Sequence, residues 1–270
     1  MHILLTNDDG IRSPGLWAAA EALSELGWVT VAAPREQSSG AGRSLPSTSD
    51  GIITEETITV HGQRWTVYAV GGTPAQAVQH GVLEIMSEPP DLVVAGINYG
   101  ENLATGVTVS GTVGAALEGA ALGFPALAVS LETPKDYHFS YSRDVDFSAA
   151  AHFTRYFAER MLQTRLPDDV YVLKVDVPWH GTVETPWRVT RLARKRYYRT
   201  VPPKRRSWQE PGTMGYGPGD PPETFDPHSD VYAVRVDKVV SVTPLSLDLT
   251  SRVDLKMLER QLRGNRAIDV

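Results

Sequence analysis

The sequence of 270 residues contains no cysteine. Disulfide bonds, thiolate nucleophiles and cysteine-ligated zinc sites are therefore excluded, which leaves oxygen and imidazole chemistry. No stretch of about 18 uninterrupted apolar residues is present, and the first residues carry no basic segment, so neither a membrane-spanning helix nor a signal peptide is predicted. We expect a cytoplasmic protein without a membrane partner.

Positive charge is also scarce. Lys and Arg number 26 against 32 Asp and Glu, which gives a net charge of −6. A general binder of nucleic acid would usually be basic, so no stable nucleic-acid partner is expected. A small anionic substrate remains compatible with this charge if a metal ion and backbone dipoles supply a positive field. Hydrophobic residues make up 41% of the chain, which is enough for a sizeable globular core.

The most informative stretch lies at the start of the chain. Residues 2–6 predict a short buried strand, and Asp8 and Asp9 follow it almost at once, ahead of a glycine and a Ser-Pro helix start. Both carboxylates are therefore expected at the carboxyl end of a strand, where open α/β sheets bind ligands. Adjacent carboxylates repel each other, and a divalent cation would remove that cost. The alternative is that one aspartate caps the helix and the other is solvated.

Predicted strands and helices alternate through the first two thirds of the chain. The predicted strands cover residues 2–6, 29–33, 58–60, 64–70, 91–96, 126–130 and 170–175. The predicted helices cover 14–26, 74–86, a segment from about 110 to 122, and 145–162. This order predicts an α/β fold with a Rossmann-like, mostly parallel sheet and helices on both faces.

The last third of the chain has a different composition. Short β-type runs at 187–190, 231–236 and 239–242 surround a Pro- and Gly-rich stretch at 202–227, and a final helix is predicted at 253–262. We therefore expect a catalytic core over residues 1–178 and a C-terminal β-rich arm and helix over 179–270 that serves oligomerisation. Basic and aromatic residues mix before the Pro-rich stretch, as in nucleic-acid contacts, but a solvated hairpin or subunit contact is favoured in an acidic chain.

Three later segments bring polar groups to the same predicted edge of the sheet. Ser39 lies in a long polar loop after the second strand, and Asn98 follows the predicted strand 91–96. Both can offer a neutral oxygen to a cation. Ser110 and Thr112 flank a glycine at a helix start, where backbone N–H groups can bind phosphate. The ordinary alternatives are a surface loop, a turn and a simple N-cap.

Several separated segments form an ordered set of motifs. They are Leu5-Thr6-Asn7-Asp8-Asp9-Gly10-Ile11 with Pro14-Gly15, Ala33-Pro34, Gln37-Ser38-Ser39-Gly40, Gly72-Thr73-Pro74, Gly96-Ile97-Asn98-Tyr99-Gly100-Glu101-Asn102, Ser110-Gly111-Thr112-Val113-Gly114-Ala115-Ala116 and Ser241-Val242-Thr243-Pro244-Leu245. Together they resemble the SurE survival-protein family of metal-dependent nucleotidases across nearly the whole chain.

This resemblance implies a Rossmann-like core that hydrolyses nucleoside monophosphates to nucleoside and phosphate, with 3′-nucleotidase and exopolyphosphatase as further activities. It implies a divalent cation, Mg²⁺ or Mn²⁺, whose ligands match Asp8, Asp9, Ser39 and Asn98. Asp8, Asp9 and Asn98 are the residues to which we assign catalytic roles.

The resemblance also implies a phosphate site and an assembly. The phosphate-contacting positions correspond to Gly40, Ser110, Gly111 and Thr112. Members of the family form dimers or tetramers by exchanging the C-terminal arm, so a homodimer or homotetramer is expected. The segment from 196 to 227 departs from the family's arm in being unusually rich in Pro and Arg.

Two other functions stay open from the residues alone. In the mechanism we favour, a cation polarises a phosphoryl oxygen and activates water, because no Ser-His pair is evident and cysteine is absent. An alternative enzyme would form an aspartyl-phosphate on Asp8, although that chemistry usually pairs acids two positions apart and position 10 is glycine. A nucleotide-binding module without turnover is the alternative from another class.

Overall fold

The computed structural model of the chain describes residues 1–138, 141–142 and 144–264. Its strands are β1 (His2–Thr6), β2 (Trp28–Pro34), β3 (Ile53–Val60), β4 (Gln63–Val70), β5 (Leu92–Tyr99), β6 (Ala126–Leu131), β7 (Val172–Val177), β8 (Trp187–Val189), β9 (Tyr198–Val201), β10 (Gly215–Pro218) and β11 (Val240–Leu245). Its α-helices are α1 (Pro14–Ser24), α2 (Pro74–His80), α3 (Gly111–Ala121), α4 (Ser148–Gln163), α5 (Asp230–Arg235) and α6 (Leu255–Leu262). A π-helical turn (Gly81–Ile85) continues α2, and short 3-10 helices cover Ala104–Thr108, Lys135–Tyr137 and Pro222–Thr224.

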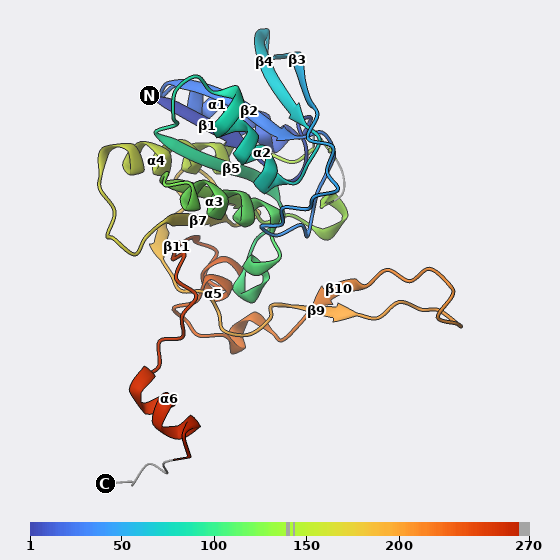
Figure 1. Cartoon of the computed structure of the whole chain (residues 1–270), viewed down its shortest axis with the longest axis vertical. Coiled ribbons are helices and arrows are strands. Elements are labelled where there is room, and N and C mark those ends of the chain that lie inside the picture. Colours follow the sequence, from blue (N-terminus) through green and yellow to red (C-terminus); the bar gives the residue numbers. More distant parts are fainter. Residues whose placement is uncertain (139–140, 143, 265–270) are drawn as a thin grey trace.

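The described residues form a nine-stranded sheet with helices on both faces (Figure 1). The strand order is β3-β4-β2-β1-β5-β6-β7-β11-β8. The strands from β4 to β7 in this order run parallel, whereas β3 is antiparallel to β4 and β11 is antiparallel to β7. The predicted α/β fold with a mostly parallel sheet is confirmed.

Alternating side chains of β1 show how both faces of the sheet become covered. Ile3 and Leu5 belong to the core layer that contains α1 and α4, whereas Leu4 belongs to the layer that contains α2 and α3. All residues of the neighbouring strand β5 are buried, as expected of a parallel strand with helices on both sides. The carboxyl end of β1 therefore emerges near the middle of one edge of the sheet.

Polar side chains fix the starts of α2 and α3. The Thr73 hydroxyl accepts a hydrogen bond from the backbone N–H of Gln76 at 3.2 Å, and the Gln76 side chain accepts one from the Thr73 N–H at 3.0 Å, which confirms the predicted N-cap. The Ser110 hydroxyl accepts from the Val113 N–H at 3.1 Å. Both helices thus begin at their predicted residues, facing the carboxyl edge of the sheet.

One prediction of local structure is wrong. The β-branched run at 231–236 predicts a strand, but the structure has the helix α5 there. The Ser229 hydroxyl caps this helix by accepting a hydrogen bond from the Tyr232 N–H at 3.3 Å, and Val231 and Val234, one turn apart, are both buried. Capping and burial of one helical face outweigh the strand propensity of the valines.

The C-terminal third contributes to two different structures. β8 and β11 extend the sheet, whereas β9 and β10 pair with each other and form a ribbon that projects from the body (Figure 1). α6 extends away from the body at the C-terminal end of the described chain (Figure 1). The division into a core over 1–178 and an oligomerising part over 179–270 stays a prediction. No helix among the described residues is long and apolar enough to cross a membrane.

Replacing Gly114 by Ala is expected to destabilise the protein, because a Cβ there would lie 2.3 Å from the carbonyl oxygen of Gly42. Relieving this clash must move α3 or the loop after β2, at a cost of about 1–3 kcal/mol in the free energy of unfolding, measured in urea. Gly106→Ala is the control, since a Cβ at that position meets nothing within 4 Å. Equal stability of the two variants would contradict this expectation.

Candidate active site

A cleft of about 600 Å³ opens at the carboxyl edge of the sheet, between the ends of β1 and β5, the start of α3 and the base of the ribbon. The sequence-predicted residues Asp8, Ser39, Gly40, Asn98 and Ser110 all line it. Parallel strands deliver their carboxyl ends to one edge, which explains why segments far apart in the chain meet here.

Asp8 and Asp9 are buried side by side at the end of β1, with only 4% and 2% of their surfaces exposed. The Thr112 hydroxyl donates to Oδ1 of Asp8 at 2.5 Å, and the Tyr99 backbone N–H donates to Oδ2 of Asp9 at 3.2 Å. Within the part of the chain that the structure describes, no Lys, Arg or His forms an ion pair with either carboxylate. Among these described residues, no cationic side chain therefore balances the negative charge of the pair.

The pKa values of the two carboxyl groups reflect this imbalance. Burial raises the pKa of Asp8, although hydrogen bonds from Thr112 partly offset the effect. Burial and the neighbouring charge of Asp8 together raise the pKa of Asp9 well above its usual range. A hard divalent cation prefers carboxylate and neutral oxygen ligands, and its positive charge would keep both groups ionised. The residues present therefore fit a divalent cation.

Gln37 connects the two aspartates to the loop after β2. Its side-chain nitrogen lies within hydrogen-bond distance of three acceptors, which its two N–H groups share: Oδ1 of Asp9 at 3.1 Å, the hydroxyl of Ser39 at 3.0 Å and the backbone carbonyl of His138 at 2.8 Å. One amide thus holds two of the predicted metal ligands in a common orientation. Its place beside Ser39 in the sequence motif is the signal that could have pointed to this role.

Asn98 presents its amide oxygen as the group available to a ligand. Its side-chain nitrogen donates to the backbone carbonyl of Gly100 at 2.6 Å and, more weakly, to that of Tyr99 at 3.3 Å. The turn role considered for this asparagine is therefore real. The turn does not prevent Asn98 from acting as a metal ligand, because the turn uses the side-chain nitrogen and leaves the side-chain oxygen as an acceptor.

The start of α3 lies directly against Asp8. A Cβ on Gly111 would lie 2.7 Å from Oδ2 of Asp8, so only glycine permits this approach. Thr112 is fully buried, and its hydroxyl is engaged by Asp8. Its side chain therefore orients a carboxylate, and a phosphate contact by Gly40, Ser110, Gly111 or Thr112 stays a prediction.

Aromatic rings at the base of the ribbon form the wall at the other end of the cleft. Tyr197, Tyr198 and Tyr216 line it together with His138. The Tyr216 hydroxyl lies 2.8 Å from Nδ1 of His138, and Nε2 lies 3.1 Å from the Thr133 carbonyl. Because a carbonyl only accepts, Nε2 donates and Nδ1 accepts from Tyr216. Burial also lowers the pKa of His138, so this neutral ring serves as part of the wall.

Glu101 lies beneath this aromatic wall. Its Oε1 accepts a hydrogen bond from the Tyr198 hydroxyl at 2.5 Å and lies 3.3 Å from Nη1 of Arg235, whereas its buried Oε2 has no hydrogen-bond partner among the described residues. Burial raises the pKa of Glu101 to about 7, against the opposing effect of Tyr198 and Arg235. The wall residues were missed in the sequence because nothing local links the ribbon to the sheet edge.

Residues 3–199 match the family described as Survival protein SurE. The chain belongs to the SurE family. It is 45% identical over 269 residues to the 5′-nucleotidase SurE of Archaeoglobus fulgidus, covering 98% of each chain. It is 44% identical to that of Thermococcus gammatolerans, covering 98% of this chain and 97% of the relative. The crystal structure of the SurE protein from Aquifex aeolicus, 33% identical, superposes with a TM-score of 0.75 over 97% of this chain and 100% of the other.

These similarities confirm the resemblance to the SurE family drawn from the motifs. The matched region contains both aspartates, Ser39, Asn98 and the start of α3. It ends within β9, so the tip of the ribbon and α6 lie outside the family match. The SurE relatives nevertheless align with nearly the full length of the chain.

Replacing Glu101 by Gln is expected to make stability less dependent on pH. Because the pKa of Glu101 rises from 4.5 to about 7 on folding, the folded protein retains a proton that the unfolded chain releases between these values. The free energy of unfolding should therefore fall as the pH rises through this range, and the slope should flatten in Glu101→Gln. Urea unfolding at several pH values measures it, with exposed Glu223→Gln as the control. Identical slopes in the wild type and Glu101→Gln would show that Glu101 does not titrate in this way.

Proposed function

We propose that the chain is a divalent-metal-dependent 5′-nucleotidase that hydrolyses nucleoside monophosphates to nucleoside and phosphate. The observation that carries this proposal is a cleft with a buried, unbalanced pair of carboxylates at one end and aromatic rings at the other. A volume of about 600 Å³ suits a ligand of this size. The names of the curated relatives support the same activity.

The cation would be held by Asp8, Asp9, Ser39 and Asn98. When bound, a cation such as Mg²⁺ or Mn²⁺ would supply positive charge that polarises a phosphoryl oxygen and lowers the pKa of a water molecule. The chain supplies the orientation of the ligands. Thr112 holds the carboxylate of Asp8, and the Gln37 amide holds Asp9 and Ser39 at hydrogen-bond distance from a single nitrogen.

The start of α3 and the loop after β2 would receive the phosphoryl group. The amino end of a helix carries a partial positive charge, and a donor aimed at a developing oxyanion is worth about 3 kcal/mol. Gly40 lines the cleft with a positive φ of 79°, and a Cβ at this position would meet nothing within 4 Å, so a phosphate could approach from that side. The aromatic wall would contact the nucleoside, since stacking of a base on a ring contributes about 1–3 kcal/mol.

We extend the proposal to 3′-nucleotides and to the ends of polyphosphate, because a cation and backbone N–H groups would contact the phosphoryl oxygens that all these substrates share. An aspartyl-phosphate on Asp8 is less favoured, because that chemistry usually pairs acids two positions apart and position 10 is glycine.

Asp8→Asn and Asp9→Asn are each expected to lower phosphate release from nucleoside monophosphates on the order of 100-fold or more, because each removes a charged ligand of the cation. The assay compares Mg²⁺, Mn²⁺, Co²⁺ and EDTA across a panel of nucleotides. Exposed Asp168, paired with Arg165, provides the control Asp168→Asn, which should keep full activity.

Three outcomes would overturn the proposal. Full activity in both Asp8→Asn and Asp9→Asn would exclude their role as ligands. Trapping of a phospho-aspartate during turnover would favour the covalent route. Nucleotide protection against thermal unfolding without phosphate release in any metal would favour a binding module.

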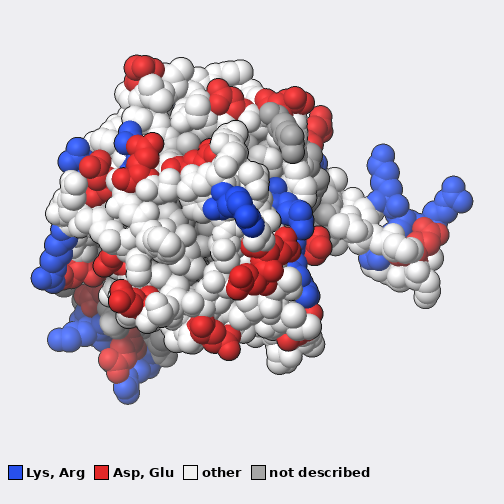
Figure 2. Space-filling view, turned by 90° about the horizontal axis from the view of Figure 1, so that it is seen from above, with Lys and Arg blue, Asp and Glu red and all other residues white. Residues whose placement is uncertain are grey.

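We further propose that residues 179–270 form a homodimer or homotetramer. Leu255, Leu258 and Leu262 are exposed and spaced along one face of α6, as in a helix that packs on a partner. The ribbon projects from the body, and Lys and Arg side chains gather toward its tip beside acidic atoms, while the body in this view also shows both charges (Figure 2).

Leu258→Asp is expected to reduce the mass of the particle measured by light scattering after size-exclusion chromatography, because a charge on the apolar face of α6 would oppose packing on a second copy. Gln261→Asp places the same charge on an exposed residue of that helix and should leave the mass unchanged. A wild-type monomer at micromolar concentration would refute the assembly.

A further inference from the structure

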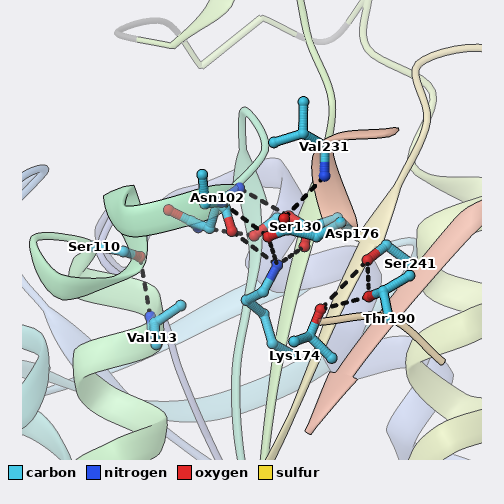
Figure 3. Close-up of polar contacts among 12 residues, drawn as sticks. Asn102, Ser110, Val113, Ser130, Lys174, Asp176, Thr190, Val231 and Ser241 are labelled. Atoms are coloured by element: carbon cyan, nitrogen blue, oxygen red, sulfur yellow. Dashed lines mark hydrogen bonds and ion pairs between the residues drawn. The ribbon is translucent and has the colours of Figure 1, made fainter. Parts of the chain in front are cut away.

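Three fully buried charged residues lie behind the cleft. Lys174 and Asp176 are on β7, and Asp230 is the first residue of α5. The Nζ atom of Lys174 forms a short ion pair with Oδ2 of Asp176 and lies 3.3 Å from Oδ2 of Asp230. We call these three residues the Lys174 cluster; Figure 3 shows Lys174 and Asp176 together with the residues around them.

The Lys174 cluster is charged although burial opposes charge. Burial alone would lower the pKa of Lys174, but the carboxylates of Asp176 and Asp230 raise it above its ordinary value, so the lysine is a cation. Buried ion pairs are often no more stabilising than apolar residues of the same volume. Stability alone therefore does not account for this cluster.

Four other hydrogen bonds of the cluster go to segments that form the two walls of the cleft. Asp176 Oδ1 accepts from the backbone N–H of Asn102 at 2.8 Å, and Lys174 donates to the carbonyl of the same residue at 2.9 Å. Asp230 accepts from the N–H of Ala104 at 2.9 Å and from that of Ala193 at 3.0 Å. Apolar side chains could not make these bonds.

These partners belong to segments that form the nucleoside end of the cleft. Asn102 lines the cleft, and its side chain donates to the Ser130 hydroxyl at 2.8 Å (Figure 3). Ala104 starts the 3-10 helix that leads to the cap of α3. Ala193 precedes Tyr197 and packs in one apolar cluster with that ring and with Ala104. The Lys174 cluster thus links the loop after β5 to the base of the ribbon.

We propose that Lys174, Asp176 and Asp230 are positioning residues that set the separation of the two walls of the cleft and so the affinity for the nucleoside part of the substrate. This inference rests on the proposed function, because it assigns the aromatic end to the nucleoside. None of the three lines the cleft as the described residues form it. Among the described residues, none of the three forms a hydrogen bond with Asp8, Asp9 or Ser39, so we expect the phosphate end to be unaffected.

The test compares a nucleotide with p-nitrophenyl phosphate, which has no nucleoside. In Lys174→Met, KM for AMP should rise at least about tenfold with kcat nearly unchanged, because a wall displaced by about 1 Å can cost up to 10²-fold. The ratio kcat/KM for p-nitrophenyl phosphate should stay within about twofold of the wild type. If Lys174 had only a structural role, Lys174→Met would lower stability and change the kinetic constants for AMP and p-nitrophenyl phosphate to the same extent.

Two further variants keep the test decisive. Ser130→Ala removes the hydroxyl that accepts from the Asn102 side chain and leaves every charge in place. It should also raise KM for AMP. If Lys174→Met does not fold, Ser130→Ala provides the test.

Thr190→Val is the control. The Thr190 hydroxyl lies 2.8 Å from those of Ser241 and Thr243 (Figure 3), in a buried cluster whose residues do not line the cleft. Its KM values should match the wild type.

The inference is overturned if Lys174→Met and Ser130→Ala leave KM for AMP unchanged, or if they impair both substrates equally. Absence of phosphate release from AMP in the wild type would instead refute the proposed function. In that case the affinity for AMP, measured by calorimetry on the same variants, replaces KM, and the same tenfold loss is expected.

Discussion

The burial of two adjacent carboxylates that pair with no Lys, Arg or His among the described residues is the constraint on which the rest of this structure depends. Asp8 and Asp9 lie just after a buried strand and are buried themselves. The neighbouring groups reduce the repulsion between the two carboxylates by donating hydrogen bonds to them. Thr112, the backbone of Tyr99 and the amide of Gln37 each contribute one such donor. The start of α3 adds its positive dipole end, so strands, loops and helix all converge on this pair.

The two ends of the cleft are held by different kinds of interaction. At the end that contains Asp8 and Asp9, neutral hydrogen-bond donors surround the carboxylates, and we propose that a cation balances their charge. At the aromatic end, the Lys174 cluster balances its own charges internally and uses its spare hydrogen bonds to hold backbone. A proposed metal site must stay open so that an ion can bind, whereas the aromatic wall must keep its position without a bound partner. Hydrogen-bond donors around the carboxylates suit the first task, and ion pairs that balance one another suit the second.

Local patterns in the sequence were sufficient for most of the fold. The strands β1, β5 and β6 are largely apolar runs because helices cover both faces of the sheet, and such runs can be recognised without knowing their neighbours. Thr73 and Ser110 mark helix starts through bonds only three residues long. The valines of α5 misled the prediction, because their burial against the body and the cap from Ser229 outweigh their strand propensity.

The sequence by itself determined the fold class and the gathering of Asp8, Ser39, Asn98 and Ser110, because the carboxyl ends of parallel strands necessarily meet at one edge. Only the tertiary structure decided how these groups are held and what faces them. Gln37 meets the carbonyl of His138 from 101 positions away, and Lys174 meets Asn102 from 72 positions away. Such contacts depend on how the loops and the ribbon pack over the sheet. Hydrophobic periodicity along the chain predicts strands and helices but not this packing.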